Sequence, residues 1–159
     1  AILKANINYL EHIVLRKSLM PISDTEYKLA RKLVYVNSAN VAAAFQRLLN
    51  EPKKLQKNIS EVHKFVVLNH VLSSYLANLS LYFNEDPSAI DSAQLKLIRK
   101  SRFYLEEAVE KVDSTTSGAS KNKLHIHLSA VKAPEHITEH LEQIAKLSAD
   151  INKISEKLD

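Results

Sequence analysis

The sequence predicts an all-α fold, an antiparallel bundle of about five helices with one mobile polar loop. The chain of 159 residues contains one Gly and four Pro, so tight β-turns have few places to form. Apolar residues make up 45% of the chain and recur at steps of three and four residues, the spacing of one helix face. Because a chain of this length holds one proper core, we expect residues 1–159 to form a single helical-bundle domain.

The composition excludes several classes of function. Without Cys, the chain has no disulfide, no thiolate metal site and no Cys nucleophile. One Gly cannot supply a Gly-rich phosphate loop, a dinucleotide fingerprint or a G-x-S-x-G motif. The 22 basic residues nearly balance the 18 acidic ones, and such a balance requires no nucleic acid. We therefore predict a protein that is not an enzyme and that has neither a cofactor nor a nucleic-acid partner.

The first helix is predicted from the beginning of the chain to Pro21, which ends it. Its apolar residues at helical spacing are Ile2, Ile7, Leu10, Ile13, Val14 and Leu19. No signal-peptide pattern is present. A helix that is already running at Ala1, without an initiator Met, predicts that the chain is a fragment of a longer protein.

The second helix is predicted from about Asp24 to Asn50. Ser23 and Glu26 form a Ser-x-x-Glu capping box, which begins a helix. The stripe that we expect to be buried is Tyr27, Val34, Val41, Ala44, Phe45 and Leu48. Pro52 follows and fits the first turn of the next helix.

The third helix is predicted from about Pro52 to Phe83, and its residues 65–83 carry no formal charge. A stretch of that length is about what a bilayer requires. Its apolar seam is Phe65, Leu68, Leu72, Tyr75, Leu79 and Tyr82. The polar residues interspersed with the seam would need partners in lipid; they are Asn69, His70, Ser73, Ser74, Asn78 and Ser80. We therefore predict the central helix of a bundle and not a membrane span.

A fourth helix is predicted to about Val112, with Asp86 as its cap and Pro87 in its first turn. Its expected buried residues are Ile90, Leu95, Ile98, Leu105, Val109 and Val112. Polar residues without periodicity follow, and we expect a flexible loop over 114–132. Residues 124–131 alternate like a strand but have no visible partner strand, so we keep them as extended loop.

The last helix is predicted from about Pro134. One face carries its apolar residues, which are Ile137, Leu141, Ile144, Ile151, Ile154 and Leu158.

The candidate metal ligands are four histidines near the end of the chain. His136 and His140 are four residues apart on one helix face, and His125 and His127 alternate on an extended stretch. No Glu directly follows the first His as in HExxH, and no Glu has a His three positions later as in di-iron bundles. We therefore predict no metal site.

Two further histidines, His63 and His70, are seven residues apart on one face of the third helix. We expect them to be core or interface histidines with hydrogen-bonded rings.

Basic residues occur in small clusters, among them Arg16, Lys17, Arg31 and Lys32. A solvated bundle surface accounts for most of them. The functional interpretation is attraction to anionic lipid headgroups, worth about 1 kcal/mol for each residue near the surface. Nucleic-acid binding would need a concentrated basic stripe with interleaved aromatic residues. Only residues 96–104 approach this pattern, and they also have the spacing of an ordinary amphipathic helix.

Three features occur in a fixed order over residues 1–83. Residues 27–32 read Tyr-x-x-Ala-Arg-Lys, an Ala-rich helix follows and ends in Leu-Leu-Asn-Glu-Pro-Lys at 48–53, and the uncharged helix comes next. In this combination the chain resembles the cytosolic C-terminal part of fusaric-acid-resistance-type (FUSC family), YccS-like inner-membrane proteins. The last helices match no motif of that family.

The resemblance implies a multi-pass parent protein that exports aromatic carboxylic acids. The chain would be its non-catalytic helical domain at the cytoplasmic face of the bacterial inner membrane, with a structural, oligomerisation or gating role. Arg16, Lys17, Arg31 and Lys32 would lie on the cytoplasmic, membrane-facing side. The implied partners are the transmembrane part of the parent, a sister cytosolic domain or a homo-oligomer, and anionic lipid headgroups.

Two alternatives remain open. The first is a free-standing helical-bundle module that binds a partner helix through an exposed groove. The second is a metal-binding bundle with His ligands.

Overall fold

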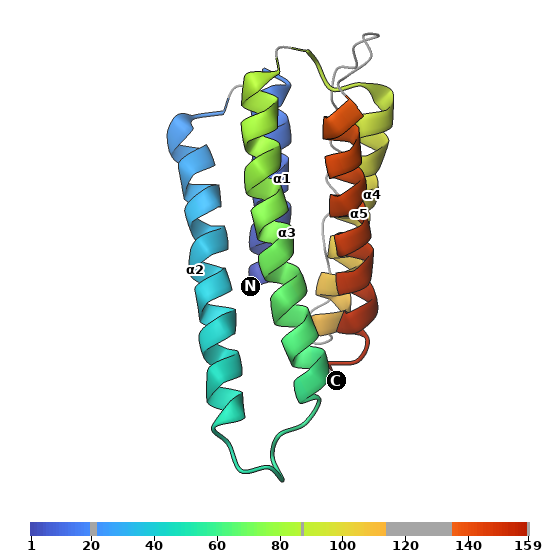
Figure 1. Ribbon diagram of the computed structural model, residues 1–159. Helices are drawn as coiled ribbons and strands as arrows, with labels where there is room; N and C mark the ends of the chain where they lie inside the picture. The colour runs from blue at the N-terminus through green and yellow to red at the C-terminus, as the bar shows by residue number, and fades with distance from the viewer. Residues whose placement is uncertain (20–21, 87, 114–134, 159) are drawn as a thin grey trace.

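A computed structural model describes residues 1–19, 22–86, 88–113 and 135–158. The described residues form five helices and no strand, which confirms the predicted all-α bundle (Figure 1). The predicted flexible loop over 114–132, with its strand-like stretch, lies outside the described residues. The helices are α1 (Ile2–Lys17), α2 (Asp24–Leu49), α3 (Ile59–Glu85), α4 (Ser92–Val112) and α5 (Glu135–Ser155).

Four of the helices form a ring, and the fifth packs on its outside. Around the ring α1 contacts α3, α3 contacts α5, α5 contacts α4 and α4 contacts α1. α2 contacts only α1 and α3, so it lies against the groove between them (Figure 1). The core is therefore enclosed by α1, α3, α4 and α5, while α2 has one buried side.

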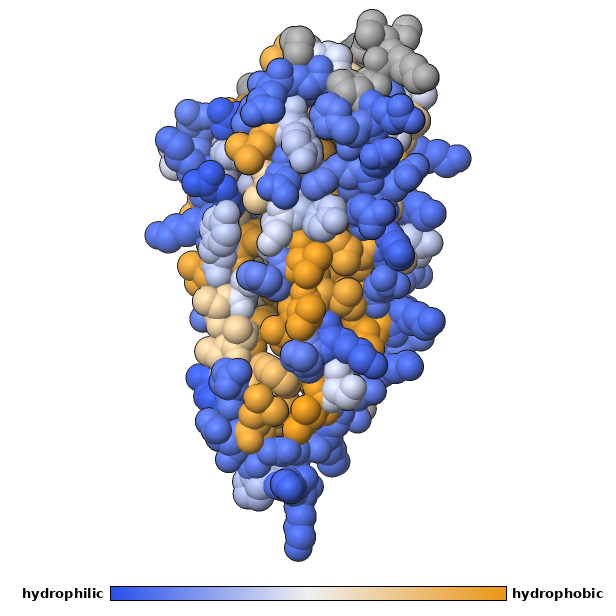
Figure 2. All heavy atoms as spheres, viewed as in Figure 1, coloured by the Kyte–Doolittle hydropathy of each residue, from blue (hydrophilic) through white to orange (hydrophobic). Residues whose placement is uncertain are grey.

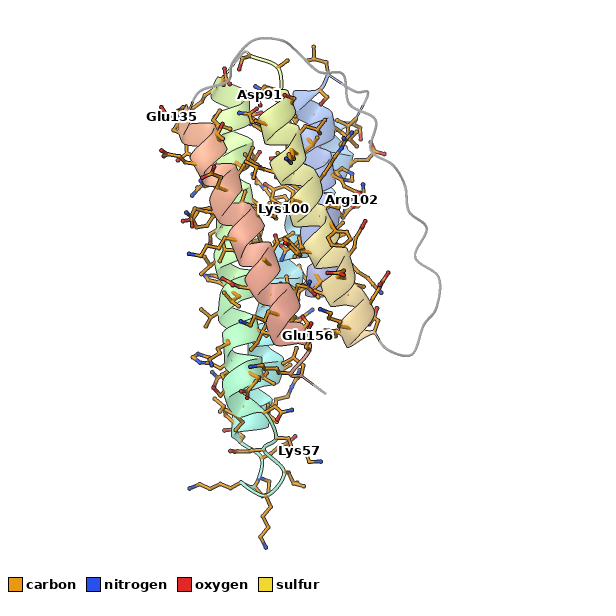
Figure 3. The ribbon with its side chains drawn as sticks, turned by 90° about the vertical axis from the view of Figure 1, so that its right-hand side faces the viewer. Lys57, Asp91, Lys100, Arg102, Glu135 and Glu156 are labelled. Atoms are coloured by element: carbon orange, nitrogen blue, oxygen red, sulfur yellow. The ribbon has the colours of Figure 1, made fainter. Side chains whose placement is uncertain are left out.

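Contacts between helix ends give the directions of the neighbours. Lys4 near the start of α1 pairs with Asp113 just after α4 at 2.5 Å, so α1 and α4 are antiparallel. Lys111 near the end of α4 pairs with Glu156 just after α5 at 2.6 Å, so α4 and α5 are parallel. Figure 3 shows the starts of these two helices, at Asp91 and Glu135, at the same end of the bundle. α1 and α3 are also parallel, and α2, which joins them in the chain, runs in the opposite direction (Figure 1). The predicted antiparallel arrangement is therefore wrong for two neighbouring pairs, α1 with α3 and α4 with α5.

The predicted capping box at the start of α2 is confirmed. The Ser23 Oγ accepts from the Glu26 backbone N–H at 3.1 Å, and the Ser23 N–H donates to the Glu26 carboxylate at 2.9 Å. Two of the backbone donors that a helix start leaves unpaired are satisfied in this way. The Ser-x-x-Glu motif therefore predicted the first residue of α2 correctly.

The predicted starts of α3 and α4 were wrong. α3 begins at Ile59, because residues 50–58 bury no apolar face and Asn58 has a left-handed backbone with φ of 51°. α4 begins at Ser92, because Asp91 and Gln94 form a second capping box. Asp86, predicted to cap α4, instead ends α3 and accepts a hydrogen bond from the Ser88 N–H at 2.9 Å.

The uncharged stretch of α3 lies in the core, as predicted. Phe65, Leu72 and Leu79 are buried, and the other three residues of the predicted seam are partly buried. Some of its polar residues face neighbouring helices: Asn69 and Ser73 bond to Asn6 of α1. The apolar residues of this stretch are thus buried by neighbouring helices, and polar residues among them find hydrogen-bond partners on α1.

Candidate functional site

The two halves of α2 differ in burial. Its buried residues are Tyr27, Ala30 and Val34, and no residue after Val34 is buried. The predicted buried stripe was therefore wrong for the second half of the helix. Ala44 is exposed there, and three further members of the predicted stripe are only partly buried; they are Val41, Phe45 and Leu48.

The register of α1 against α2 explains this difference. The rings of Tyr9 and Tyr27 lie 5.8 Å apart on antiparallel helices. Ile2, seven residues before Tyr9, therefore lies level with Val34, seven residues after Tyr27. Residues 35–49 therefore extend about 22 Å beyond the level where α1 begins. Beside that part lies α3: the Phe45 and His63 rings stack at 5.3 Å, and residues of both helices line one groove.

Apolar and small side chains cover this exposed half. Residues 33–46 carry no formal charge, and Val36 is 44% exposed. A groove of about 540 Å³ runs between α2 and α3, and its lining residues include Tyr35, Ala39, Ala42, Ser74 and Ala77. Figure 2 shows apolar side chains gathered over the lower half of the molecule. We call residues 33–49 of α2 with 63–78 of α3 the α2–α3 face.

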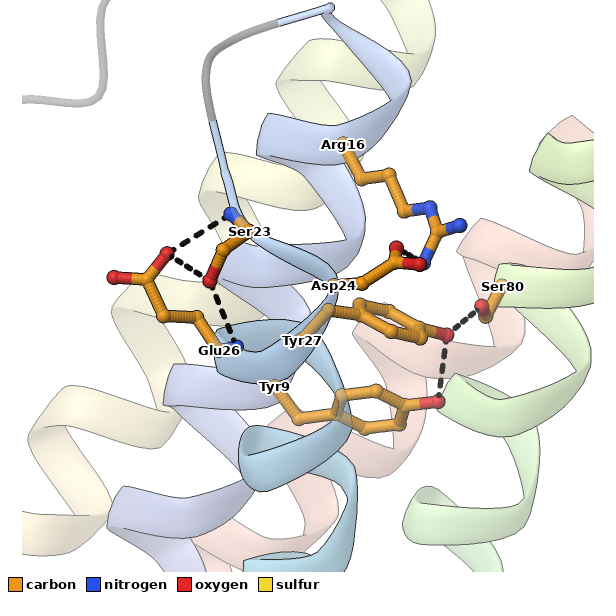
Figure 4. Close-up of polar contacts among 7 residues, drawn as sticks. All are labelled: Tyr9, Arg16, Ser23, Asp24, Glu26, Tyr27 and Ser80. Atoms are coloured by element: carbon orange, nitrogen blue, oxygen red, sulfur yellow. Dashed lines mark hydrogen bonds and ion pairs between the residues drawn. The ribbon is translucent and has the colours of Figure 1, made fainter.

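The first half of α2, in contrast, is held by a polar network (Figure 4). The Tyr27 hydroxyl bonds to Ser80 of α3 and to the Tyr9 hydroxyl of α1, the latter at 3.3 Å. Burial raises the pKa of the Tyr9 phenol above its usual value. The α2–α3 face is thus carried on a helix that is fixed at one end.

The four basic residues predicted to face a membrane have two different surroundings. Arg16 pairs with Asp24 at 3.3 Å and lies over the Tyr27 ring, while Lys17 donates to the backbone carbonyl of Phe83 at 3.1 Å. Burial lowers the pKa of Lys17. Arg16 and Lys17 therefore join the end of α1 to α2 and α3. The other two, on α2, are exposed; they are Arg31 and Lys32.

The candidate metal ligands pack against tyrosines. His140 hydrogen-bonds through its ring nitrogen to the Tyr75 carbonyl at 2.7 Å, and its ring stacks on Tyr75 at 4.7 Å. His136 meets the edge of the Tyr82 ring at 5.4 Å. His125 and His127 lie outside the described residues, and within the described ones no three His, Asp or Glu side chains gather as metal ligands would.

The histidines predicted for the core or an interface are exposed. His63 stacks on Phe45 between α2 and α3, and His70 lines the α2–α3 groove. Both therefore belong to the α2–α3 face and not to the core.

Comparisons with known proteins give no relative for this chain: no family model, no curated protein and no solved structure matches it. Over the part of the chain that the structure describes, no helix is long and apolar enough to cross a membrane. The α2–α3 face is therefore judged by its geometry alone.

Proposed function

We propose that the chain is the non-catalytic helical domain of a FUSC-like membrane transporter, and that the α2–α3 face packs against a further helix of that protein. The order of features over residues 27–53 and the uncharged helix after them support the family proposal. The domain then has a structural, oligomerisation or gating role, and export of aromatic carboxylic acids belongs to the membrane part of the parent.

The main support for the packing role is the second half of α2, in which no residue is buried. Residues 35–49 lie beyond the level of Ile2, where α1 begins, and have α3 beside them. A helix of about four turns in line with α1 would cover them over a length of about 22 Å. The alanines at 39 and 42–44 let such a helix approach closely, because the distance between two packed helices depends on the side chains at the contact.

A free-standing interaction module is the second candidate, and the groove between α2 and α3 favours it. An apolar groove of about 540 Å³ between two helices is the kind of site that accepts the apolar face of a partner helix. The two candidates use the same face and differ in where the covering helix comes from. In the first it belongs to the parent chain, and in the second to another protein.

Cysteine labelling tests the packing role, because the chain contains no Cys of its own. Ala43→Cys places a thiol on the exposed part of α2, and Lys100→Cys places a control thiol on exposed α4. In the chain alone we expect both thiols to react readily with a maleimide. In the parent protein in its native membrane we expect Ala43→Cys to react more slowly by at least on the order of tenfold, which corresponds to about 1.4 kcal/mol of packing.

The control thiol at position 100 should react equally in both preparations. If Ala43→Cys in the membrane-embedded parent reacts as fast as in the chain alone, no helix covers α2 and the packing role is wrong.

A further inference from the structure

Lysines gather at the end of the molecule where α2 and α3 are joined. Lys53, Lys54 and Lys57 lie in the connecting loop, and Figure 3 shows Lys57 at the extremity of the bundle. Three more lysines line a neighbouring groove; they are Lys64, Lys153 and Lys157. All six are exposed, and among the described residues none of the six lies within ion-pair distance of a carboxylate. We call these six lysines, with Leu55, the basic tip.

Acidic residues are fewer at this end. Glu51, Glu61 and Asp150 are near the lysines in sequence or line the same groove. Glu156 is paired with Lys111 at 2.6 Å. The basic tip therefore keeps an excess of positive charge, in a protein whose overall balance is only +4.

The loop holds an apolar side chain among these lysines. The Gln56 amide donates to the Leu49 carbonyl at 3.0 Å and to the Glu51 carbonyl at 2.7 Å, and the Leu55 N–H donates to the Pro52 carbonyl at 2.8 Å. The loop is thus fixed by its own hydrogen bonds, yet Leu55 is 61% exposed. Leu55 belongs neither to the core nor to the partly buried residues packed against it.

Next to the loop, the groove between α3 and α5 combines the same two properties. It has a volume of about 400 Å³, and its apolar lining residues are Val67, Leu68 and Ile154. Lys64 and Lys153 lie among its lining residues. Apolar surface beside ammonium groups matches a lipid, in which acyl chains lie beneath an anionic headgroup.

We propose that the basic tip docks on the surface of an anionic lipid bilayer, with its lysines on headgroup phosphates and Leu55 inserted between the lipids. A polybasic segment is attracted to anionic lipids, and an apolar side chain adds a second, salt-independent contribution. Among the described residues, the tip has no exposed Phe, Tyr or Trp on which bases of a single strand would stack. This chemistry favours a bilayer over a nucleic acid.

The docking also orients the domain that we proposed above. α1 begins partway along the molecule, about 22 Å short of the end of α2 that leads into the basic tip, and runs away from the tip (Figure 1). Arg16 and Lys17 lie in the last turn of α1, far from the basic tip. If the basic tip contacts the membrane, these two residues do not face it, in contrast to the expectation from the family resemblance.

Co-sedimentation with phosphatidylcholine vesicles, with and without phosphatidylglycerol, tests the proposal on the chain alone. We expect binding only to the anionic vesicles. Replacing Lys53, Lys54 and Lys57 together by Ala should lower the partition coefficient on the order of 100-fold, because each lysine near an anionic surface contributes about fivefold. Leu55→Ser should lower it about tenfold without changing the charge.

The matched control replaces Lys28, Arg31 and Lys32 together by Ala, which removes the same charge from exposed positions on the first half of α2. We expect this variant to bind nearly as well as the natural chain, and circular dichroism checks that both triple variants are folded. Equal losses in the two triple variants would overturn the proposal, since net charge alone would then decide binding.

Two other results would also overturn it. One is failure of the natural chain to bind anionic vesicles at low salt, and the other is tighter binding of an oligonucleotide than of vesicles at the same salt. Because these measurements use the chain alone, they are independent of the thiol labelling in the parent protein.

Discussion

Leu76→Ala is expected to lower the free energy of unfolding by about 3–4 kcal/mol. Leu76 lies in the uncharged stretch of α3, and its side chain is fully buried where α3 meets the rest of the ring. The substitution removes apolar contacts and leaves a cavity that the neighbouring helices fill only in part. Urea unfolding followed by circular dichroism measures the change.

Leu81→Ala on the same helix is the matched control. The Leu81 side chain is 58% exposed, so its removal should change the free energy of unfolding by less than about 0.5 kcal/mol. Similar costs at the two positions would contradict the orientation of α3 and, with it, the assignment of the uncharged stretch to a bundle core.

Asn6→Leu is expected to cost about 2–3 kcal/mol. Asn6 is fully buried, donates to the Asn69 side chain at 3.3 Å and accepts from the Ser73 hydroxyl at 3.0 Å. Leu has nearly the same shape as Asn but no polar atoms, so the side-chain amide oxygen of Asn69 is left buried and without its donor. An unpaired buried group costs its full desolvation energy.

The double variant Asn6→Leu with Asn69→Leu distinguishes this cause from simple misfit. Because it removes both partners, it should be less destabilised than the sum of the two single variants, by about 1 kcal/mol. The same urea titrations measure all three variants. Strict additivity would show that Asn6 and Asn69 do not interact across α1 and α3.

The sequence allowed the core of the bundle to be predicted, because its signals are local. Ser23 and Glu26 marked the start of α2. The three- and four-residue spacing identified buried residues in α3, α4 and α5, among them Leu72, Ile98 and Ile144. Apolar spacing and capping are properties of one helix, so the sequence of that helix is enough to detect them.

The starts of α3 and α4 were predicted wrongly for two different reasons. Pro52 fits a first helical turn, but Asn58 has a left-handed backbone and the lysines between them give the loop no apolar face. For α4, the sequence offers two aspartates as the N-cap, Asp86 and Asp91. Asp91 has Gln94 three residues later, a capping-box signal that the sequence contained and that outweighs Asp86.

The α2–α3 face could not be predicted, because it depends on where another helix begins. The spacing of Val41, Ala44 and Leu48 continues that of the buried first half of α2, so the sequence shows one uniform stripe. Only the register set by Tyr9 and Tyr27 shows that α1 does not reach the second half. The one feature of the sequence that pointed to this face was the run of alanines at 42–44. Alanines permit another helix to pack closely, but they do not show which helix it is.

The reading frame upstream of Ala1 tests the central claim most directly. Our account predicts a segment of about four helical turns whose apolar residues continue the spacing of Ile2, Leu3 and Leu10, preceded by several apolar segments of about 20 residues. The first would cover α2 and the others would cross the membrane. A start codon within a few residues of Ala1 would contradict the account, and the α2–α3 face would then belong to a free-standing module.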